Sequence, residues 1–509
     1  MAVNIKSATH IGINSCLINV EVDITKGLPS FAIVGLADAS VREAKERVRA
    51  AIINSGFEFP LGRIIINLAP ADIKKIGTLL DLPIAIGILI ESKQISKKDL
   101  EDFILVGELS LSGKLKKSRG IIPIILSGID EGIDNFIIPN ENEDEACKLG
   151  KGNVFPLNSL KDAVNYINFQ DLVPLEFKNT NTENEIEFES NFDSIIGQYS
   201  SKRALEVAAA GRHNIILYGN PGSGKTMLAK AFTSILPPLN EEEKVEVAKI
   251  YSISGMMDTY KNISIPFRQP HNTITKVALI GGGKDIKAGE ITLAHNGVLY
   301  LDEILEFKKE VLEVLRLPLE DGIVRIDRIN ERVELPSRFQ LIGSYNPCPC
   351  GQKSILGYEN DKCKCSDLEV RRYQKRLSKA LKDRIDMFNY VPLLKFDELK
   401  EIDNKGESEK IKEKVIEARK IQEDRLKGTP YKCNSDINGK DIFKLCTISR
   451  EARSLLENYF ETNNPSIRGY GKVIKVARTI ADLEKAKDIN INHVLEAISY
   501  RKDSNGEII

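Results

Sequence analysis

A glycine-rich turn between an apolar run and a helical run sets the firmest limit on the fold of this chain. Residues 219–226 read GNPGSGKT, with NIILY before them and MLAKAF after them. This order fits G-x-x-x-x-G-K-[ST], in which backbone N–H groups and a helix N-terminus cradle phosphate. A chance glycine-rich turn is the alternative, and the flanking strand and helix argue against it. The predicted nucleotide-binding residues are Gly219, Asn220, Pro221, Gly222, Ser223, Gly224, Lys225 and Thr226.

The side chains of this turn and of a later acidic pair have separate predicted roles. Lys225 is predicted to reach the β- and γ-phosphates of ATP, and the Thr226 hydroxyl to ligate Mg²⁺. A second apolar run, 297–301 (GVLYL), ends at Asp302 and Glu303. Downstream of a phosphate-binding turn, this pair predicts that Asp302 holds the Mg²⁺ shell and that Glu303 polarises the attacking water. Alone, an acidic pair after a buried strand is more often a helix cap.

A third apolar run, 339–345 (FQLIGSY), ends in a polar side chain, Asn346. A polar group at the end of a strand beside the phosphate-binding turn would help to orient the water. A turn-forming asparagine before Pro347 explains the residue equally well. The sequence pattern leaves both interpretations open.

Composition and length exclude several classes of protein. A chain of 509 residues is too long for one hydrophobic core, so about two to four domains are expected. The 72 basic and 73 acidic side chains argue against a generally polybasic protein, although a local basic stripe is enough to contact nucleic acid. Residues 1–20 lack the continuous apolar core of a secretory signal, and no apolar run approaches the roughly 20 residues of a membrane helix. We expect a cytoplasmic protein without a membrane span.

Apolar patterning divides the chain into three parts. Residues 1 to about 175 mix short apolar runs with helical periods, from about Phe192 the pattern is strand–turn–helix, and after about Pro392 it is mostly helical. The asparagine-, threonine- and glutamate-rich stretch 177–190 has little to bury and is the predicted linker. In the first part we expect strands at 16–24, 30–34, 63–68, 103–106 and 135–138, and helices at 39–55 and 81–92. In the last part we expect helix faces formed by Ile411, Val415, Ala418 and Ile421 and by Tyr470, Ile474, Ala477 and Ile480.

Together these pieces resemble the magnesium-chelatase-like AAA+ ATPases, specifically the YifB/ComM family. The matching stretches are 34–60, 66–75, 81–89, 192–230, 289–307 and 466–484. The resemblance implies an α/β fold. It divides the chain into a Lon-protease-like (ribosomal S5 domain 2-like) α/β domain at 1–176, a linker at 177–191, an AAA+ P-loop core with a cysteine-rich insertion at 192–394, and a helical lid at 395–509. The core is expected to be a parallel sheet with helices on both faces.

The resemblance also implies roles for two arginines of this chain. Arg384 in LKDRIDM is similar to the arginine finger that reaches a neighbouring subunit's γ-phosphate, and Arg468 in SIRGYG is similar to the sensor arginine of the lid. A surface ion pair is the default interpretation of either arginine alone. A finger that acts in trans implies a ring, expected to be a homo-hexamer. The family motif PHH is replaced by Pro270-His271-Asn272, so a role that needs the second histidine is not carried over.

Two arginine-rich segments are candidates for contact with DNA. Residues 322–336 (GIVRIDRINERVELP) predict a β-hairpin that turns near 329–330, and its position resembles a pore-lining hairpin of this branch of AAA+ proteins. Residues 361–384 hold nine Lys or Arg against four Asp or Glu. A solvated face explains either segment as well. The candidate DNA contacts are Arg325, Arg328 and Arg332, with Arg371, Arg372, Lys375, Arg376 and Lys379 in the second segment.

The first domain resembles a Lon-type protease that has lost its catalytic dyad. The stretch 107–124 (GELSLSGKLKKSRGIIPI) carries the resemblance. The segment for the nucleophile, 77–87 (GTLLDLPIAIG), has no serine, and the segment for the lysine reads RGIIPI. Lys116 and Lys117 lie nearby but have no nucleophile to activate. We therefore expect binding or assembly from this domain.

Four of the eight cysteines are grouped in two close pairs, Cys348 with Cys350 and Cys363 with Cys365. Four thiolates suffice for a tetrahedral structural Zn²⁺ site, although C-x-C pairs are less usual than C-x₂-C. The alternatives are four independent reduced thiols or a site that has lost its metal. A metal here would brace the loop after Asn346.

The sequence thus favours an ATP-driven motor on DNA, of the helicase type that the family resemblance implies for branch migration during DNA uptake and recombination, with recombination proteins as candidate partners. ATP-driven remodelling of protein partners, or chelatase-type metal insertion, is the second hypothesis, and the additional first domain argues against a plain chelatase subunit. A Lon-like protease is disfavoured by the missing dyad.

Overall fold

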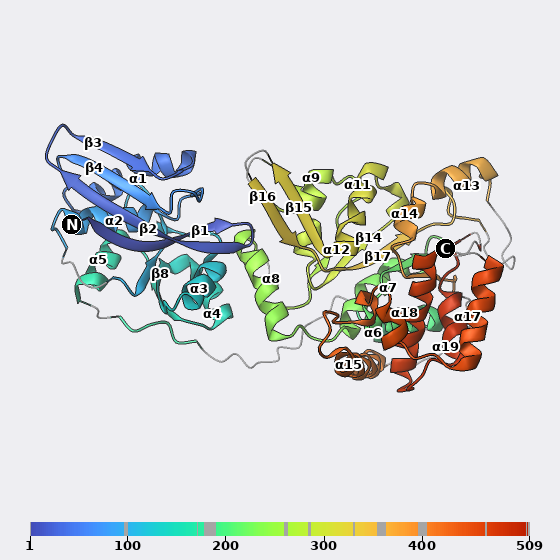
Figure 1. Cartoon of the computed structure of the whole chain (residues 1–509). Coiled ribbons are helices and arrows are strands. Elements are labelled where there is room, and N and C mark those ends of the chain that lie inside the picture. The colour runs from blue at the N-terminus through green and yellow to red at the C-terminus, as the bar shows by residue number, and fades with distance from the viewer. Residues whose placement is uncertain are drawn as a thin grey trace. The chain divides into compact units, whose positions relative to one another are not determined.

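The structure is a computed structural model of the whole chain (Figure 1). It describes residues 2–95, 100–169, 172–177, 190–258, 263–283, 287–328, 331–353, 363–394, 405–463, 466–504 and 506. The chain forms two compact units. The first holds Met1–Asn184, Asn240–Ile263 and Asp327–Leu335, and the second holds Glu185–Leu239, Ser264–Ile326 and Pro336–Ile509. Most of the predicted linker, 178–189, lies outside the described residues.

The first unit is built on a seven-stranded mixed sheet with the order β3-β4-β2-β1-β5-β8-β9. Antiparallel pairing joins β4, β2 and β1, and the other neighbours are parallel. The strands are β1 (Val3–Ile11), β2 (Asn14–Thr25), β3 (Ser30–Val34), β4 (Arg63–Ala69), β5 (Phe103–Leu105), β8 (Asn135–Pro139) and β9 (Asn153–Leu157). The short strands β6 (Glu108–Leu109) and β7 (Leu115–Lys116) pair separately.

Within the described residues of Met1–Asn184, the α-helices are α1 (Ala39–Asn54), α2 (Asp81–Glu91), α3 (Ile121–Asp130), α4 (Glu143–Leu149) and α5 (Leu160–Phe169). Helix α2 is buried from Asp81 to Ile90 because its sequence is apolar on all sides. Asp81, its one buried acidic residue, accepts hydrogen bonds from Arg47 Nε (2.8 Å) and Nη2 (3.0 Å). The expected strands and helices of this region are confirmed, and β1, which was not expected, forms a long hairpin with β2.

Helix α8 (Glu241–Ile253) belongs to the first unit, although the chain on both sides of it belongs to the second. Asn240 and Glu243 form a capping box at its start. Near its end, Ser252 is 1% exposed, and its carbonyl oxygen accepts a hydrogen bond from the Gly120 N–H (3.1 Å). Its hydroxyl donates to the buried Glu145. The structure thus docks a segment that the sequence places inside the AAA+ core onto the elements α3 and α4.

The second unit contains a five-stranded sheet with the order β11-β14-β17-β10-β18, in which every neighbouring pair is parallel. The strands are β11 (Phe267–Arg268), β14 (Val298–Leu301), β17 (Gln340–Tyr345), β10 (Ile215–Tyr218) and β18 (Met387–Tyr390). Strands β14, β17, β10 and β18 are buried almost throughout, which is typical of parallel strands covered by helices. The helices α6 (Tyr199–Gly211) and α7 (Lys225–Ala231) flank β10 in the chain. The parallel α/β core predicted for this region is confirmed.

The C-terminal part of this unit is helical, as expected. It contains α15 (Glu407–Leu426), α17 (Arg450–Asn463), α18 (Ile467–Leu483) and α19 (Ile491–Ser499). On α18 the expected face is buried at Ile474, Ala477 and Ile480. On α15 the buried positions are Val415, Ala418, Gln422 and Leu426, and Ile411 and Ile421 are only partly buried.

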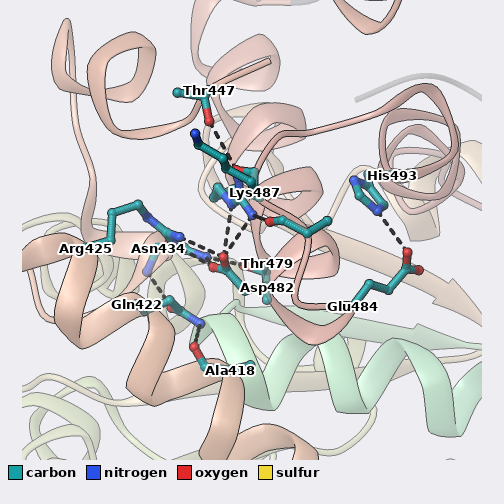
Figure 2. A network of polar contacts seen from close by, with 12 residues as sticks. Ala418, Gln422, Arg425, Asn434, Thr447, Thr479, Asp482, Glu484, Lys487 and His493 are labelled. Carbon is teal, nitrogen blue, oxygen red and sulfur yellow. Dashed lines mark hydrogen bonds and ion pairs between the residues drawn. The ribbon is translucent and has the colours of Figure 1, made fainter. Parts of the chain in front are cut away.

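A buried polar network fastens α18 to α15 (Figure 2). Asp482 accepts hydrogen bonds from Arg425 Nη1 (2.7 Å) and Nη2 (2.6 Å), and from Arg478 Nε (3.1 Å). Asn434 Nδ2 donates one hydrogen bond to the same carboxylate (2.9 Å) and another to Thr479 Oγ1 (2.9 Å). The network fixes the helix whose first turn carries Arg468.

The predicted arginine hairpin is confirmed as a pair of strands, β15 (Ile323–Arg328) and β16 (Glu331–Pro336). Among the described residues, no helix is long and apolar enough to cross a membrane.

Candidate nucleotide-binding site

Three strand ends bring the predicted nucleotide-binding residues together. In the parallel sheet, Tyr218 at the end of β10 pairs with Tyr345 at the end of β17, and Leu301 at the end of β14 pairs with Gly343. The carboxyl ends of neighbouring parallel strands share one edge of the sheet. The phosphate-binding loop, the acidic pair and Asn346 each follow one of these strands, so all three lie at that edge.

Lys225, the first residue of α7, directs its ammonium group into the loop. Its Nζ donates hydrogen bonds to the carbonyl oxygens of Gly219 (2.8 Å) and Asn220 (2.9 Å). A third acceptor is Asn346 Oδ1 at 3.2 Å. The polar side chain at the end of β17 therefore touches the lysine of the loop, which a turn-forming asparagine alone would not require.

The loop glycines leave room for a ligand. Gly222 and Gly224 have φ of 80° and 88°, and a Cβ added at either would meet no atom within 4 Å. Gly219 is different, because a Cβ there would lie 2.3 Å from the Val391 carbonyl oxygen. The open space beside Gly222 and Gly224 and the close packing at Gly219 fit a loop that wraps a phosphate.

Asp302 lies among hydroxyl groups at the end of β14. Its Oδ1 accepts from the Tyr300 hydroxyl (2.8 Å) and from Ser344 Oγ (2.5 Å), and its Oδ2 accepts from Thr226 Oγ1 (3.2 Å). The backbone N–H of Glu303 completes the set at 3.1 Å. A carboxylate and a threonine hydroxyl in contact are the oxygen donors that Mg²⁺ takes beside a nucleotide. The two side chains fit the predicted metal.

Glu303 has a left-handed backbone with φ of 50°, a conformation that is costly for a residue with a side chain. Its N–H also donates to Ser344 Oγ (3.1 Å). Its side chain and that of Asp302 line a cavity of about 240 Å³ whose other walls are Gln269, Pro270, His271 and Asn272. That volume has room for several water molecules.

The four residues 269–272 were not predicted as part of the site. Strand β11 runs parallel to β14, with Arg268 in register with Leu299, so the chain that follows β11 arrives beside Asp302. A bidentate pair of Arg268 with Glu290 (2.7 and 2.8 Å) holds this strand end. The short apolar run before residues 270–272 (PHN) could have indicated a strand there. Only the strand order places those residues next to the acidic pair.

Burial changes the protonation of the loop lysine. Desolvation lowers the pKa of Lys225 to about 8, and the nearby carboxylates of Asp302 and Glu303 counteract part of that decrease. A phosphate bound in the loop would add negative charge and stabilise the ammonium form.

Arg384 and Arg468 meet at one carboxylate, that of Glu320. Arg384 donates to the carbonyl oxygens of Arg316 (3.0 Å) and Ala380 (2.7 Å), and its guanidinium pairs with Glu320. Arg468 Nη2 lies 2.8 Å from Glu320 Oε1. Glu320 lies in α12 (Pro318–Asp321), Arg384 just after α14 (Lys379–Lys382), and Arg468 in the first turn of α18. The structure brings the two arginines together through a residue that the sequence did not single out.

The candidate DNA contacts pair with nearby acidic groups. Arg325 and Arg332 are exposed. Arg325 Nη1 lies 3.3 Å from Asp321, and Arg332 Nε lies 3.3 Å from Asp327. Arg328 ends β15, and its side chain is outside the described residues. In the basic segment, α13 (Asp367–Gln374) and the residues after it expose Arg371, Arg372, Lys375, Arg376 and Lys379, with Arg376 paired to Glu306 (2.9 Å).

The four clustered cysteines converge. Their sulfur atoms all lie within 4.8 Å of one another. Cys348 Sγ is 3.3 Å from Cys350 and 3.5 Å from Cys363, and Cys350 is 3.6 Å from Cys363. These separations exceed the roughly 2.05 Å of a disulfide bond.

Three family models match the chain. "Magnesium chelatase, subunit ChlI" matches residues 191–399, "Subunit ChlI of Mg-chelatase" matches 20–142, and "Magnesium chelatase, subunit ChlI C-terminal" matches 405–501. Similar proteins include the competence protein ComM of Haemophilus influenzae, 39% identical over 501 residues that cover 97% of this chain and 96% of that protein. YifB of Salmonella typhimurium is 40% identical over 493 residues, covering 96% of this chain and 95% of that protein. The magnesium-chelatase subunit ChlI of Guillardia theta is 26% identical over 181 residues, or 31% of this chain and 51% of that protein.

A parallel sheet that carries a phosphate-binding loop, an acidic pair and a polar residue on adjacent strand ends is typical of P-loop ATPases of the AAA+ kind, and the matching family models place this chain among the magnesium-chelatase-like proteins. The matches to ComM and YifB extend over nearly the whole chain, including the first unit. The chain therefore belongs to the YifB/ComM family.

Proposed function

We propose that this protein is an ATP-hydrolysing AAA+ ring motor that acts on DNA, with helicase-type branch migration during DNA uptake and recombination as its activity. The observation that carries the ATPase part is the convergence of Lys225, Thr226, Asp302 and Asn346 at one edge of the sheet. ATP and Mg²⁺ are the proposed ligands of this edge.

Each side chain of the site has a proposed role. The loop amides and Lys225 bind the β- and γ-phosphates, and Thr226 and Asp302 hold Mg²⁺, which supplies positive charge to the transferring phosphoryl group. Glu303 polarises the attacking water, for which the cavity beside it has room. Asn346, in contact with Lys225, orients that water or the γ-phosphate.

Arg384 is proposed to act on the nucleotide of a neighbouring subunit in a homo-hexamer, and Arg468 is proposed to serve as the sensor arginine of the helical lid. Support comes from their common position at Glu320, whose carboxylate pairs with both guanidinium groups. A guanidinium supplied in trans stabilises charge on the phosphoryl oxygens. The Arg384→Ala variant should assemble but fail to turn over.

DNA is the proposed polymer because one similar protein is named for competence and because two exposed arginine segments are present. Arg325, Arg328 and Arg332 in the hairpin are the proposed phosphate contacts, and α13 adds a second basic surface. Residues 1–176, proposed as a Lon-like domain without a dyad, would serve binding or assembly, including binding of recombination proteins.

The four thiolates after Asn346 are proposed to hold Zn²⁺, which is tetrahedral in structural sites of this kind. The proposed boundaries of the remaining parts are a linker at 177–191, an AAA+ core at 192–394 and a lid at 395–509.

Remodelling of protein partners or chelatase-type metal insertion is the alternative. It is favoured by the similarity to magnesium-chelatase subunits, which covers 31% of this chain. That similarity leaves most of the chain without a counterpart.

The test is the ATPase rate of the full-length protein with and without forked or single-stranded DNA, across a salt series. DNA should stimulate the rate, and the stimulation should fall steeply with salt because phosphate contacts release counterions. Lys225→Ala should abolish both rates. Arg325→Ala with Arg332→Ala should reduce only the stimulation, and the exposed Arg450→Ala serves as its matched control. A DNA-indifferent ATPase would favour the alternative, and no hydrolysis under any condition would reject the whole proposal.

A further inference from the structure

We infer that Zn²⁺ bound by Cys348, Cys350, Cys363 and Cys365 supports the phosphate-binding loop, so that nucleotide affinity depends on a metal that does not touch the nucleotide. The inference rests on the proposed nucleotide site and adds a means of controlling it. It is carried by the geometry of the four sulfurs and by the contacts of the turn that bears two of them.

The sulfur positions match one tetrahedral ion. With Zn–S bonds of about 2.3 Å, the sulfurs of a tetrahedral site lie about 3.8 Å apart. The three measured separations among Cys348, Cys350 and Cys363 are 3.3, 3.5 and 3.6 Å. Cys365 lies within the same 4.8 Å group. Four thiolates grouped to this extent are the ligand set that a soft cation such as Zn²⁺ takes.

Backbone N–H groups also point at the sulfurs. The Gln352 N–H hydrogen-bonds to Cys350, the Cys350 N–H to Cys365, and the Cys365 N–H to Cys363. Such bonds orient the sulfurs for a metal. The pairs therefore form a preorganised ligand set of two C-x-C turns.

The first of these turns packs directly on the loop. Gly351, whose N–H donates to the Cys348 carbonyl oxygen (2.9 Å), has φ of 76°. A Cβ added to Gly351 would lie 2.5 Å from Cγ and 2.7 Å from Cδ of Pro221, the third residue of the loop. Backbone and proline ring are thus in contact, and movement of the turn would release the ring.

The same turn controls Asn346. Cys348 is fully buried and follows Asn346 by two residues, and Asn346 Oδ1 accepts from Lys225. Between them, the Pro347 carbonyl oxygen accepts from Gln374 Nε2 at 3.0 Å. Asn346 is therefore held by α13 on one side and by the cysteine turn on the other. Loss of the metal would remove the restraint that the cysteine turn places on Asn346. Both Asn346 and Pro221 would then become more mobile.

The test uses the full-length protein purified without chelator. Elemental analysis should give one zinc per chain, and a fluorescent ADP analogue should bind the zinc-loaded form. Removal of zinc by a chelator should weaken this binding by at least about tenfold, which corresponds to about 1.4 kcal/mol, and zinc added back should restore it. Cys365→Ser should lose zinc and show the same weakening, whereas the exposed Cys147→Ser should bind zinc and nucleotide as the parent does.

A second variant separates the support of the loop from loss of folding. Gly351→Ala keeps all four cysteines but sets a methyl group against Pro221 and strains a backbone with φ of 76°, so it should retain zinc by elemental analysis and bind the ADP analogue more weakly. Thermal unfolding of each variant confirms that it is folded. A chain without zinc, or one whose nucleotide affinity is the same with and without zinc, overturns the inference. A zinc-loaded chain that binds no nucleotide would instead reject the proposed function, so the two failures are distinguishable.

Discussion

Two aspartates of the second unit have opposite surroundings. Asp482 in the lid is 1% exposed and accepts hydrogen bonds from two arginines and one asparagine. Asp302 at the end of β14 is partly exposed, and within the described part of the chain its donors are three hydroxyls and one backbone N–H. The charge of Asp482 is therefore balanced by hydrogen-bonded guanidinium groups, whereas the described hydrogen-bond donors to Asp302 are all neutral and the Lys225 ammonium interacts with it only through its charge.

This difference separates a structural cluster from a functional one. A buried carboxylate between two guanidinium groups is balanced by the protein itself and has no need of a ligand. A carboxylate that is surrounded by oriented neutral dipoles, with a second carboxylate beside it, is suited to receive a cation. The contrast explains why we assign Asp302 to metal binding and Asp482 to the attachment of α18.

The largest expected effect is on turnover, at the residue beside Asp302. Glu303→Gln should retain nucleotide binding and reduce the hydrolysis rate by about 10²–10⁴-fold, because the amide cannot accept a proton from the water. Single-turnover hydrolysis and nucleotide affinity, measured on the same preparation, check it. Glu306→Gln, an exposed glutamate paired with Arg376, is the matched control and should hydrolyse normally. Full activity in the Glu303 variant would remove this residue from the role of base.

The next effect is on stability, at the other aspartate. Asp482→Ala should lower the free energy of unfolding by about 3–5 kcal/mol, because it leaves Arg425 and Arg478 without their shared counter-charge. Chemical denaturation of the full chain measures it. Asp424→Ala is the control, since its pair with Lys427 (2.9 Å) is exposed and should contribute less than about 1 kcal/mol.

A smaller loss of stability is expected from substitution of Asp302 than from substitution of Asp482. Asp302→Ala should lower the free energy of unfolding by only about 1–3 kcal/mol, because it leaves the buried hydroxyls of Tyr300 and Ser344 without an acceptor but leaves no arginine without its counter-charge. The same variant should lose the dependence of nucleotide affinity on Mg²⁺. If Asp302→Ala unfolded as readily as Asp482→Ala, the distinction between the two aspartates would fail.

A smaller effect is expected from pH. The pKa of Lys225 is lowered to about 8 by burial, so the free protein loses this proton as the pH rises above 8. Bound phosphate keeps the ammonium protonated, so binding takes up a proton above pH 8, and affinity should fall about tenfold between pH 7 and pH 9. Calorimetric titrations in buffers of different ionisation enthalpy would detect the proton uptake. Glu303→Gln, which removes a charge that raises this pKa, should move the transition to lower pH.

The smallest effect concerns the carboxylate shared by the two arginines. Glu320 is 35% exposed in its side chain, so Glu320→Gln should change the free energy of unfolding by less than about 1 kcal/mol. If Arg384 acts on a neighbouring subunit, the variant should still alter the concentration at which ATPase activity appears. Sedimentation combined with activity measurements would show a change in assembly. An unchanged activity threshold would argue that Glu320 only solvates the arginines.

Much of the fold was predictable because its signals are local. The run NIILY before the loop and the all-apolar stretch 81–90 each identify an element without reference to the rest of the chain. The strand β1 was missed because its lysine, serine, threonine and histidine interrupt the apolar pattern, although pairing with β2 buries Ser7 and Thr9. Helix α8 was assigned to the core by its position in the chain, and its buried Ser252 is explained only by Gly120 and Glu145.

The amino-acid sequence alone determined the phosphate-binding loop, the acidic pair after β14, the two cysteine pairs and the family, because each of these depends on the spacing of residues within one short segment. Only the tertiary structure placed residues 269–272 beside Glu303, joined Arg384 to Arg468 at Glu320, and set Gly351 against Pro221. Those contacts link segments far apart in the chain, and strand order and close packing, which leave no periodic trace in the sequence, decide them.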